Sequence, residues 1–208
     1  MNDSRLISHI ESLLRLNTLK DIKTIDNLIS FASSIDDREN RSLIMSKIAS
    51  SLASEGNIDK ALEVTASIEL SYEKSESLQK IANYLISIGH REKALKILQE
   101  AQKAIEQVDE LWQKAELLNR IAYCYFQSCL PNQAFLIWEQ AIYTAKFGEQ
   151  SASLQDSVDS SSVLREIAET LALTNNLEKA LEVAESIKSV GKRNDAIKYV
   201  KMKFSNRN

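Results

Sequence analysis

The sequence predicts an all-α protein built from repeated helical hairpins. Of its 208 residues only 4 are Gly and 1 is Pro, whereas β-sandwiches and barrels use many of both in their turns. Apolar residues recur at helical spacing, and a short pattern of Ile and Ala occurs four times along the chain. One hairpin cannot bury its apolar face alone, so we expect the hairpins to stack into one α-solenoid domain over residues 1–208.

The repeat begins with an Ile-Ala pair and continues with a second Ala twelve residues after the first. The pairs are Ile48-Ala49, Ile81-Ala82, Ile121-Ala122 and Ile167-Ala168, and the later alanines are Ala61, Ala94, Ala134 and Ala180. Small side chains at both places let two antiparallel helices approach closely. The midpoints are Gly56, Gly89, Cys129 and Asn175. Gly and Asn suit a left-handed turn after a helix, whereas Cys129 does not, although Pro131 can begin the next helix.

The repeat predicts these elements in order. Helices are expected near 3–16, 21–35, 39–55, 57–70, 73–88, 90–107, 109–128, 131–147, 160–174, 176–189 and 192–204. Residues 3–35 are interpreted as a degenerate first hairpin and residues 39–189 as four further hairpins. The segment 192–204 is interpreted as a capping helix, with Lys198, Lys201 and Lys203 facing water.

The spacing of the repeat widens along the chain. Ile48 and Ile81 are 33 residues apart, and the next two steps, to Ile121 and Ile167, are 40 and 46 residues. We expect the first excess to lengthen two helices, because residues 101–112 are rich in helix formers. The second excess is interpreted as a Ser-rich surface loop over 148–160.

Composition limits the function. The chain has 26 Lys and Arg against 29 Asp and Glu, a net charge of −3, so no nucleic-acid partner is expected. No apolar run is long enough for a membrane span and no signal-type segment opens the chain, so a cytoplasmic protein without a membrane partner is expected. His9 and His90 lie in different hairpins, and Cys124 and Cys129 are not at zinc spacing. No catalytic motif is visible. We therefore expect no metal, no cofactor and no catalytic residue.

The pattern resembles the tetratricopeptide repeat family, over about residues 24–204. The resemblance lies in the small helix-A residue, the turn Gly and the helix-B Ala; the Trp favoured early in helix A is replaced by Met45, Leu78, Leu118 and Leu164. It implies a right-handed α-solenoid and a non-catalytic scaffold or adaptor, which binds a peptide or helix of a partner protein in a concave groove lined by the first helix of each hairpin.

Helical spacing gives the residues expected in that groove. They are Glu76, Gln79, Asn83, Ile86, Glu116, Asn119, Tyr123, Phe126, Arg165 and Glu169. Asn side chains can hydrogen-bond a ligand backbone, and Tyr is frequent at binding hot spots. The alternative interpretation is an ordinary solvated helix face.

Aromatic residues concentrate in one region. Eight of the 13 lie between Trp112 and Phe147. They indicate either a contact surface, such as that of a homodimer in a self-associating structural subunit, or a hairpin that needs larger core residues. The second interpretation is favoured, because Tyr125 and Trp138 fall at core positions. A third hypothesis is an α-solenoid enzyme of the chaperone-lyase type. It requires clustered titratable groups, which the sequence does not show.

Overall fold

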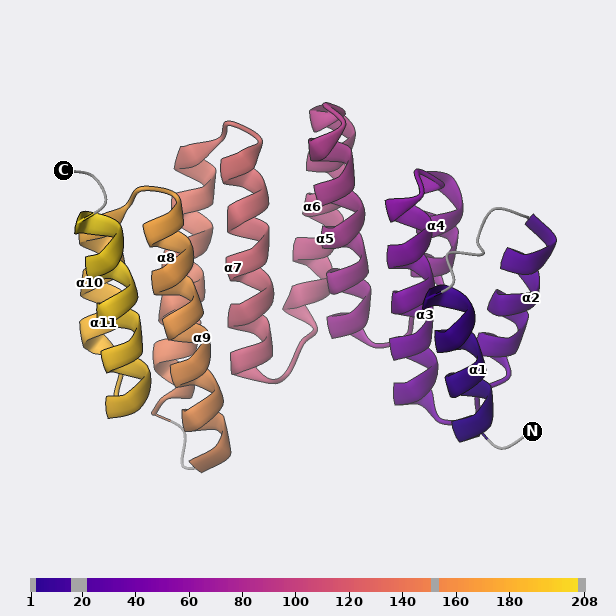
Figure 1. The fold of residues 1–208 in the computed structure, drawn as a ribbon, viewed down its shortest axis with the longest axis horizontal. Helices are drawn as coiled ribbons and strands as arrows, with labels where there is room; N and C mark the ends of the chain where they lie inside the picture. The colour runs from indigo at the N-terminus through magenta and orange to yellow at the C-terminus, as the bar shows by residue number, and fades with distance from the viewer. Residues whose placement is uncertain (1–2, 16–21, 151–153, 206–208) are drawn as a thin grey trace. The chain divides into compact units, whose positions relative to one another are not determined.

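The computed structural model describes residues 3–15, 22–150 and 154–205, and its regular elements in these ranges are all α-helices (Figure 1). They are α1 (Asp3–Arg15), α2 (Ile22–Ser33), α3 (Arg38–Ser54), α4 (Ile58–Ala66), α5 (Ser71–Ser87), α6 (Arg91–Glu106), α7 (Leu111–Gln127), α8 (Pro131–Gly148), α9 (Leu154–Leu173), α10 (Leu177–Ser186) and α11 (Val190–Ser205). Each lies where the sequence predicts a helix. Most ends shift by a few residues, and the start of α9 shifts further. The all-α prediction is confirmed.

The chain divides into two compact units, Met1–Gln107 and Val108–Asn208. In the first unit, consecutive helices pack as the pairs α1/α2, α3/α4 and α5/α6, and α3 also contacts α1 and α5. In the second unit, α7/α8 and α9/α10 are pairs, and α9 also contacts α7, α8 and α11. The expected single domain and the expected single solenoid would each include both units, whereas each unit is described here by itself. Both expectations therefore stay predictions.

The repeated Ile and Ala residues form the contacts between paired helices. The four Ile-Ala pairs and the four later alanines are all fully buried, with no exposed surface. A methyl side chain at each helix contact lets the paired helices approach closely, and the adjacent Ile supplies most of the buried apolar area. The interpretation of these residues as core is therefore confirmed.

All four repeat turns have the same backbone geometry. The φ angle is 82° at Gly56, 85° at Gly89, 63° at Cys129 and 72° at Asn175. In each turn the next N–H donates to the carbonyl five residues earlier, as from Leu130 to Tyr125 at 3.0 Å. This is the Schellman arrangement, which satisfies the last carbonyls of a helix. Cys129 therefore adopts a left-handed conformation despite its side chain.

The first excess in repeat spacing, between Ile81 and Ile121, is accounted for by one longer helix. The expectation of two lengthened helices is wrong, because α7 has 17 residues, the same as α3 and α5. By contrast, α6 has 16 residues where α4 has 9. Ala101 and Ile105 are buried on α6. The extension thus has an apolar face of its own, and this favours continuing the helix.

The second excess is also largely helical. The predicted Ser-rich loop over 148–160 is wrong for residues 154–160, which belong to α9, while residues 151–153 lie outside the described residues. Ser160 and Ser161 are buried, and Ser161 donates a hydrogen bond to Glu149. A Cβ atom added to Gly148 would lie 2.2 Å from Ser160 Oγ. The serines therefore lie at a close helix contact, where small residues are required. The loop was predicted because a Ser-rich composition is also typical of loops.

The last helix has the predicted two faces. Ala196 and Val200 are buried, whereas Lys198 and Lys201 are exposed. Lys203 is partly covered, and its ammonium lies 5.4 Å from the centroid of the Tyr199 ring. Within the described ranges, every helix is too short or too polar to cross a bilayer.

Candidate functional site

The predicted groove residues lie on the first helices of three hairpins. In the first unit, α5 carries Glu76, Gln79, Asn83 and Ile86. In the second unit, α7 carries Glu116, Asn119, Tyr123 and Phe126, and α9 carries Arg165 and Glu169. A single groove would need both sets, and each belongs to a separate unit. The continuous groove therefore stays a prediction.

Asn119 has a structural role in the second unit. Its side chain is only 5% exposed, because it lies among α7, α8 and α9. Its Oδ1 accepts a hydrogen bond from Trp138 Nε1 at 3.0 Å, and its Nδ2 donates to Thr170 Oγ1 at 3.4 Å. The indole N–H must find an acceptor when Trp is buried. Asn119 therefore has little exposed polar surface with which to bind a ligand.

Two other predicted residues are also engaged in packing. The Phe126 ring centroid lies 6.0 Å from that of Trp138, and Gln79, the counterpart of Asn119 on α5, is 6% exposed. Tyr125 and Trp138 are buried, as the favoured interpretation of the 112–147 region expects, whereas Tyr143 and Phe147 are exposed.

The charged candidates lie nearer the surface and form ion pairs along their own helices. Glu76 pairs with Lys80 at 3.2 Å, Glu116 with Arg120, and Arg165 with Glu169 at 2.9 Å. Such pairs, four residues apart, add a few tenths of a kcal/mol, about 0.3–0.5 each.

The facing sides of α7 and α9 also place acidic groups near one another. Partial burial raises the pKa of Glu166, and the negative charge of Glu116 acts in the same direction. The charges of Arg120 and Arg165 oppose this shift. The surroundings of Glu166 therefore contain both acidic and basic groups.

A hollow of about 370 Å³ lies on the first helices of the first unit. We call it the α1–α3–α5 hollow, after the helices that line it with Glu11, Leu14, Lys47, Ser50 and Lys80. Lys47 forms an ion pair with Glu11, and Lys80 with Glu76. The hollow is thus built from one face of three consecutive hairpins, which is where the resemblance expects a ligand. Its lining carries two cations and one anion.

None of the five lining residues was predicted from the sequence, although the sequence carries a signal for two of them. Lys47 and Lys80 each directly precede the Ile of the repeat, as Arg120 and Glu166 do in later copies. This position of the repeat therefore carries a charged residue in all four copies. Glu11 and Leu14 carry no such signal, because the first hairpin lacks the repeat pattern.

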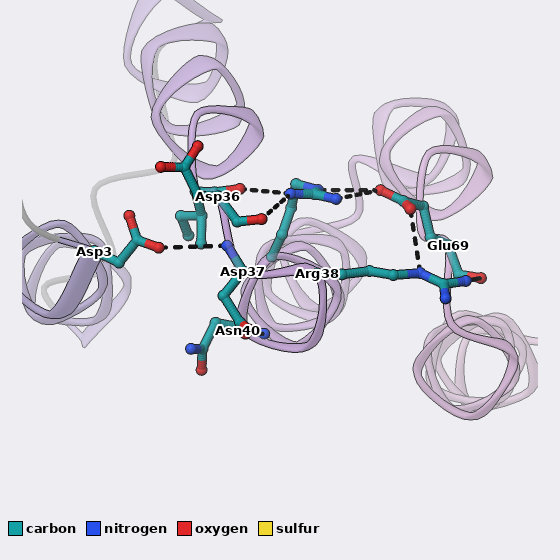
Figure 2. A network of polar contacts seen from close by, with 8 residues as sticks. Asp3, Asp36, Asp37, Arg38, Asn40 and Glu69 are labelled. Carbon is teal, nitrogen blue, oxygen red and sulfur yellow. Dashed lines mark hydrogen bonds and ion pairs between the residues drawn. The ribbon is translucent and has the colours of Figure 1, made fainter.

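A larger hollow, of about 490 Å³, lies among α4, α5 and α6. Several of its side chains hold helix ends in place. The Lys74 ammonium lies 3.5 Å from the Ala66 carbonyl oxygen, and the Glu69 carboxylate pairs with Arg38 at 3.3 Å and Arg41 at 2.7 Å (Figure 2). The Arg41 hydrogen bond, with the charges of both arginines, holds the pKa of Glu69 below its usual value. This hollow is the weaker candidate, because its charged groups already serve the fold.

The described residues contain no cluster of metal-ligating side chains. In those ranges no three His, Cys, Asp or Glu side chains come together in a way that could hold a metal ion. Cys124 is buried within α7, Cys129 is exposed in its turn, and the two are not joined by a disulfide.

Comparisons with known proteins add little. Neither a family model nor a curated protein matches the sequence. Among solved structures, the chain is similar to the crystal structure of Ton1535 from Thermococcus onnurineus NA1, at 16% sequence identity. The match covers 98% of this chain and 84% of that one, with a TM-score of 0.32. A similarity this low carries no argument, so the tetratricopeptide resemblance stays a prediction.

Proposed function

We propose that this chain is a non-catalytic interaction module, a tetratricopeptide-like right-handed α-solenoid that binds a peptide segment of a partner protein on its first helices. The α1–α3–α5 hollow is the observation that carries the proposal. Three consecutive hairpins contribute to it, and α3 contacts both α1 and α5. Asn83 and Glu76 of the predicted groove set lie on α5 near Lys80 in the sequence, at helical spacing. They extend the same face.

The lining indicates the chemistry of the ligand. Lys47 and Lys80 can each exchange the carboxylate that they now pair with, Glu11 or Glu76, for a carboxylate of the ligand, and Leu14 offers an apolar contact. Both lysines are paired at the surface, where exchanging one carboxylate partner for another changes the free energy little. The ligand that fits is therefore an extended or helical peptide with acidic side chains and at least one apolar side chain.

A peptide array tests the proposal. The full chain is applied to peptides that vary in the number and spacing of acidic residues, and the best binder is titrated by fluorescence anisotropy. The variant Lys47→Glu with Lys80→Glu should bind about tenfold more weakly or worse, because two attractive charges become repulsive. Added salt should weaken wild-type binding.

The matched control changes the same charges elsewhere. Lys93→Glu with Lys96→Glu alters two exposed lysines of α6 that do not line the hollow. This control should bind as wild type does. Equal affinity of the wild type and the Lys47/Lys80 variant, with both folded, would refute the proposed site.

A further inference from the structure

The second helix of the fourth hairpin, α8, exposes an apolar stripe. On α8, Leu136 is 72% exposed, Tyr143 73% and Phe147 56%. Their separations of seven and four residues place them within about 40° of one another around the helix. The buried residues Ala134, Ala141 and Ala145 lie on the opposite side of α8. We call Leu136, Tyr143 and Phe147 the α8 stripe.

The repeat itself does not require this stripe. Leu136 stands two residues after the repeat Ala, and the matching residues in the other second helices are Glu63, Lys96 and Glu182. On α6, the residues that match Tyr143 and Phe147 are Lys103 and Gln107. At the Leu136 position every other copy therefore carries a charged residue, and at the Tyr143 and Phe147 positions α6 carries polar ones. Contiguous exposed apolar surface of this kind marks an interaction site.

We propose that the α8 stripe binds a second copy of this chain, through antiparallel pairing of α8 with α8 of the second copy. Antiparallel pairing about a two-fold axis near residues 142–143, in the middle of the helix, brings Leu136 close to Phe147 of the second copy. The two-fold axis repeats this contact, so Phe147 also lies close to Leu136 of the second copy. Both ends of the stripe are then covered, as a self-complementary interface requires.

The charges beside the stripe select this occupant and this direction. Glu139 and Lys146 are seven residues apart, so they flank the stripe on the same side. In the antiparallel pair, Glu139 faces Lys146 of the second copy, and Lys146 faces Glu139 of the second copy. In a parallel two-fold pair the two copies of this flank lie on opposite sides of the seam, so Glu139 and Lys146 do not meet.

Glu139 is available for this exchange. It pairs with Lys179 at 3.0 Å, while Lys179 also pairs with Glu182 at 3.0 Å. Lys179 therefore keeps a carboxylate when Glu139 turns to the second copy. One helix pair buries a small interface, below about 1,200 Å², so the dimer should be weak and dependent on concentration.

Sedimentation equilibrium of the full chain over a wide concentration range tests the pairing. The variant Leu136→Lys with Tyr143→Lys places on α8 the residues that α6 carries at the matching positions. Its association constant should fall about tenfold or more, with unchanged helicity by circular dichroism. The control Leu173→Lys adds a charge at an exposed apolar residue of α9, outside the stripe, and should dimerise as wild type does.

A charge exchange tests the direction and does not depend on the lysine variant folding. Glu139→Lys alone should weaken the dimer, and combining it with Lys146→Glu should restore it. A wild type that stays monomeric at every concentration would overturn the proposal, as would unchanged association of the Leu136/Tyr143 variant. Failure of the combined variant to recover would overturn the antiparallel arrangement. Binding of the stripe to an unrelated amphipathic helix by a chain that stays monomeric would show a different occupant.

Discussion

Cys129 is the least suited residue among the four repeat turns. It holds φ at 63°, whereas two other turns use Gly and one uses Asn. A side chain at positive φ costs about 1–2 kcal/mol, because Cβ crowds the carbonyl oxygen. The Schellman hydrogen bonds offset this cost, because they pair the last carbonyl groups of α7 just before α8 begins at Pro131.

Replacing this residue should stabilise the chain. Cys129→Gly is expected to raise the free energy of unfolding by about 1 kcal/mol, measured by urea denaturation. The reverse substitution is Gly89→Ala. Gly89 has a φ angle of +85°, and an added Cβ atom would have no neighbouring atom within 4 Å. That variant should lose about 1 kcal/mol from the backbone alone. A less stable Cys129→Gly would contradict this account of the turn.

Asn119 should behave as a core residue rather than as a binding residue. Asn119→Ala leaves the Trp138 Nε1 donor buried without its acceptor, so we expect a loss of about 1–3 kcal/mol in unfolding free energy. Adding Trp138→Phe removes the orphaned donor, and the double variant should lose less than the sum of the two single variants. Strict additivity of the two losses would show that the hydrogen bond contributes nothing.

Glu73 predicts a pH dependence of stability. Partial burial raises its pKa, and the charges of Glu76 and Glu39 add to the shift. The folded state therefore holds the proton more tightly than the unfolded state. The contribution to stability is present at low pH, and it is lost as the pH rises through the raised pKa. Glu73→Gln should thus be more stable than wild type at neutral pH. It should match wild type at pH values below the ordinary Glu pKa. A difference that does not vary with pH, in denaturation series of the two proteins, would refute the assignment.

At the scale of elements, cations hold the junctions between hairpins. Arg41 donates to the Ile35 carbonyl at 2.6 Å, and Arg193 donates to the Ile187 carbonyl at 3.1 Å. In both cases the cation follows a buried Ile by six residues, and it lies near the carboxyl end of the preceding helix, where positive charge is favourable. The spacing from Ile68 to Lys74 is the same. The sequence holds this signal, but it is weak because Arg and Lys are common on any helix.

The contact between α8 and α9 should be sensitive to volume. Gly148→Ala places a methyl group 2.2 Å from Ser160 Oγ and 3.4 Å from Leu111 Cβ. Because Ser160 is buried, its side chain has little room to move, and we expect a loss of about 1–3 kcal/mol. Gly191→Ala is the matched control, since nothing lies within 4 Å of the added Cβ. It should gain about 0.4–1 kcal/mol in α11. Equal thermal stability of the two variants would contradict close packing at Gly148.

At the scale of the whole molecule, the two proposed sites use different elements and different chemistry. Lys47→Glu with Lys80→Glu changes the polar α1–α3–α5 hollow, and Leu136→Lys with Tyr143→Lys changes the apolar α8 stripe. We expect the first variant to dimerise as wild type does and the second to keep peptide affinity. Sedimentation and anisotropy on both variants measure this. Loss of both activities in either variant, with helicity retained, would show that the sites are one.

The sequence by itself determined the helices, their pairing residues and three of the four turns. These follow from local rules: apolar periodicity, small residues at helix contacts, and Gly or Asn where φ is positive. It predicted a loop over 148–160, of which residues 154–160 are helical, because Ser occurs both in loops and at close helix contacts. Only Gly148 on the neighbouring helix distinguishes these two cases.

The tertiary structure alone decided which polar residues face solvent. Asn119 and Gln79 have the sequence signature of surface residues, yet packing of neighbouring helices buries both. Leu136 and Tyr143 have the signature of core residues, yet they lie on the exposed side of α8. Helical spacing fixes the angle of a side chain around its own axis. Whether that angle meets water or another helix depends on neighbours far away in the chain, and this is the information that the sequence pattern lacks.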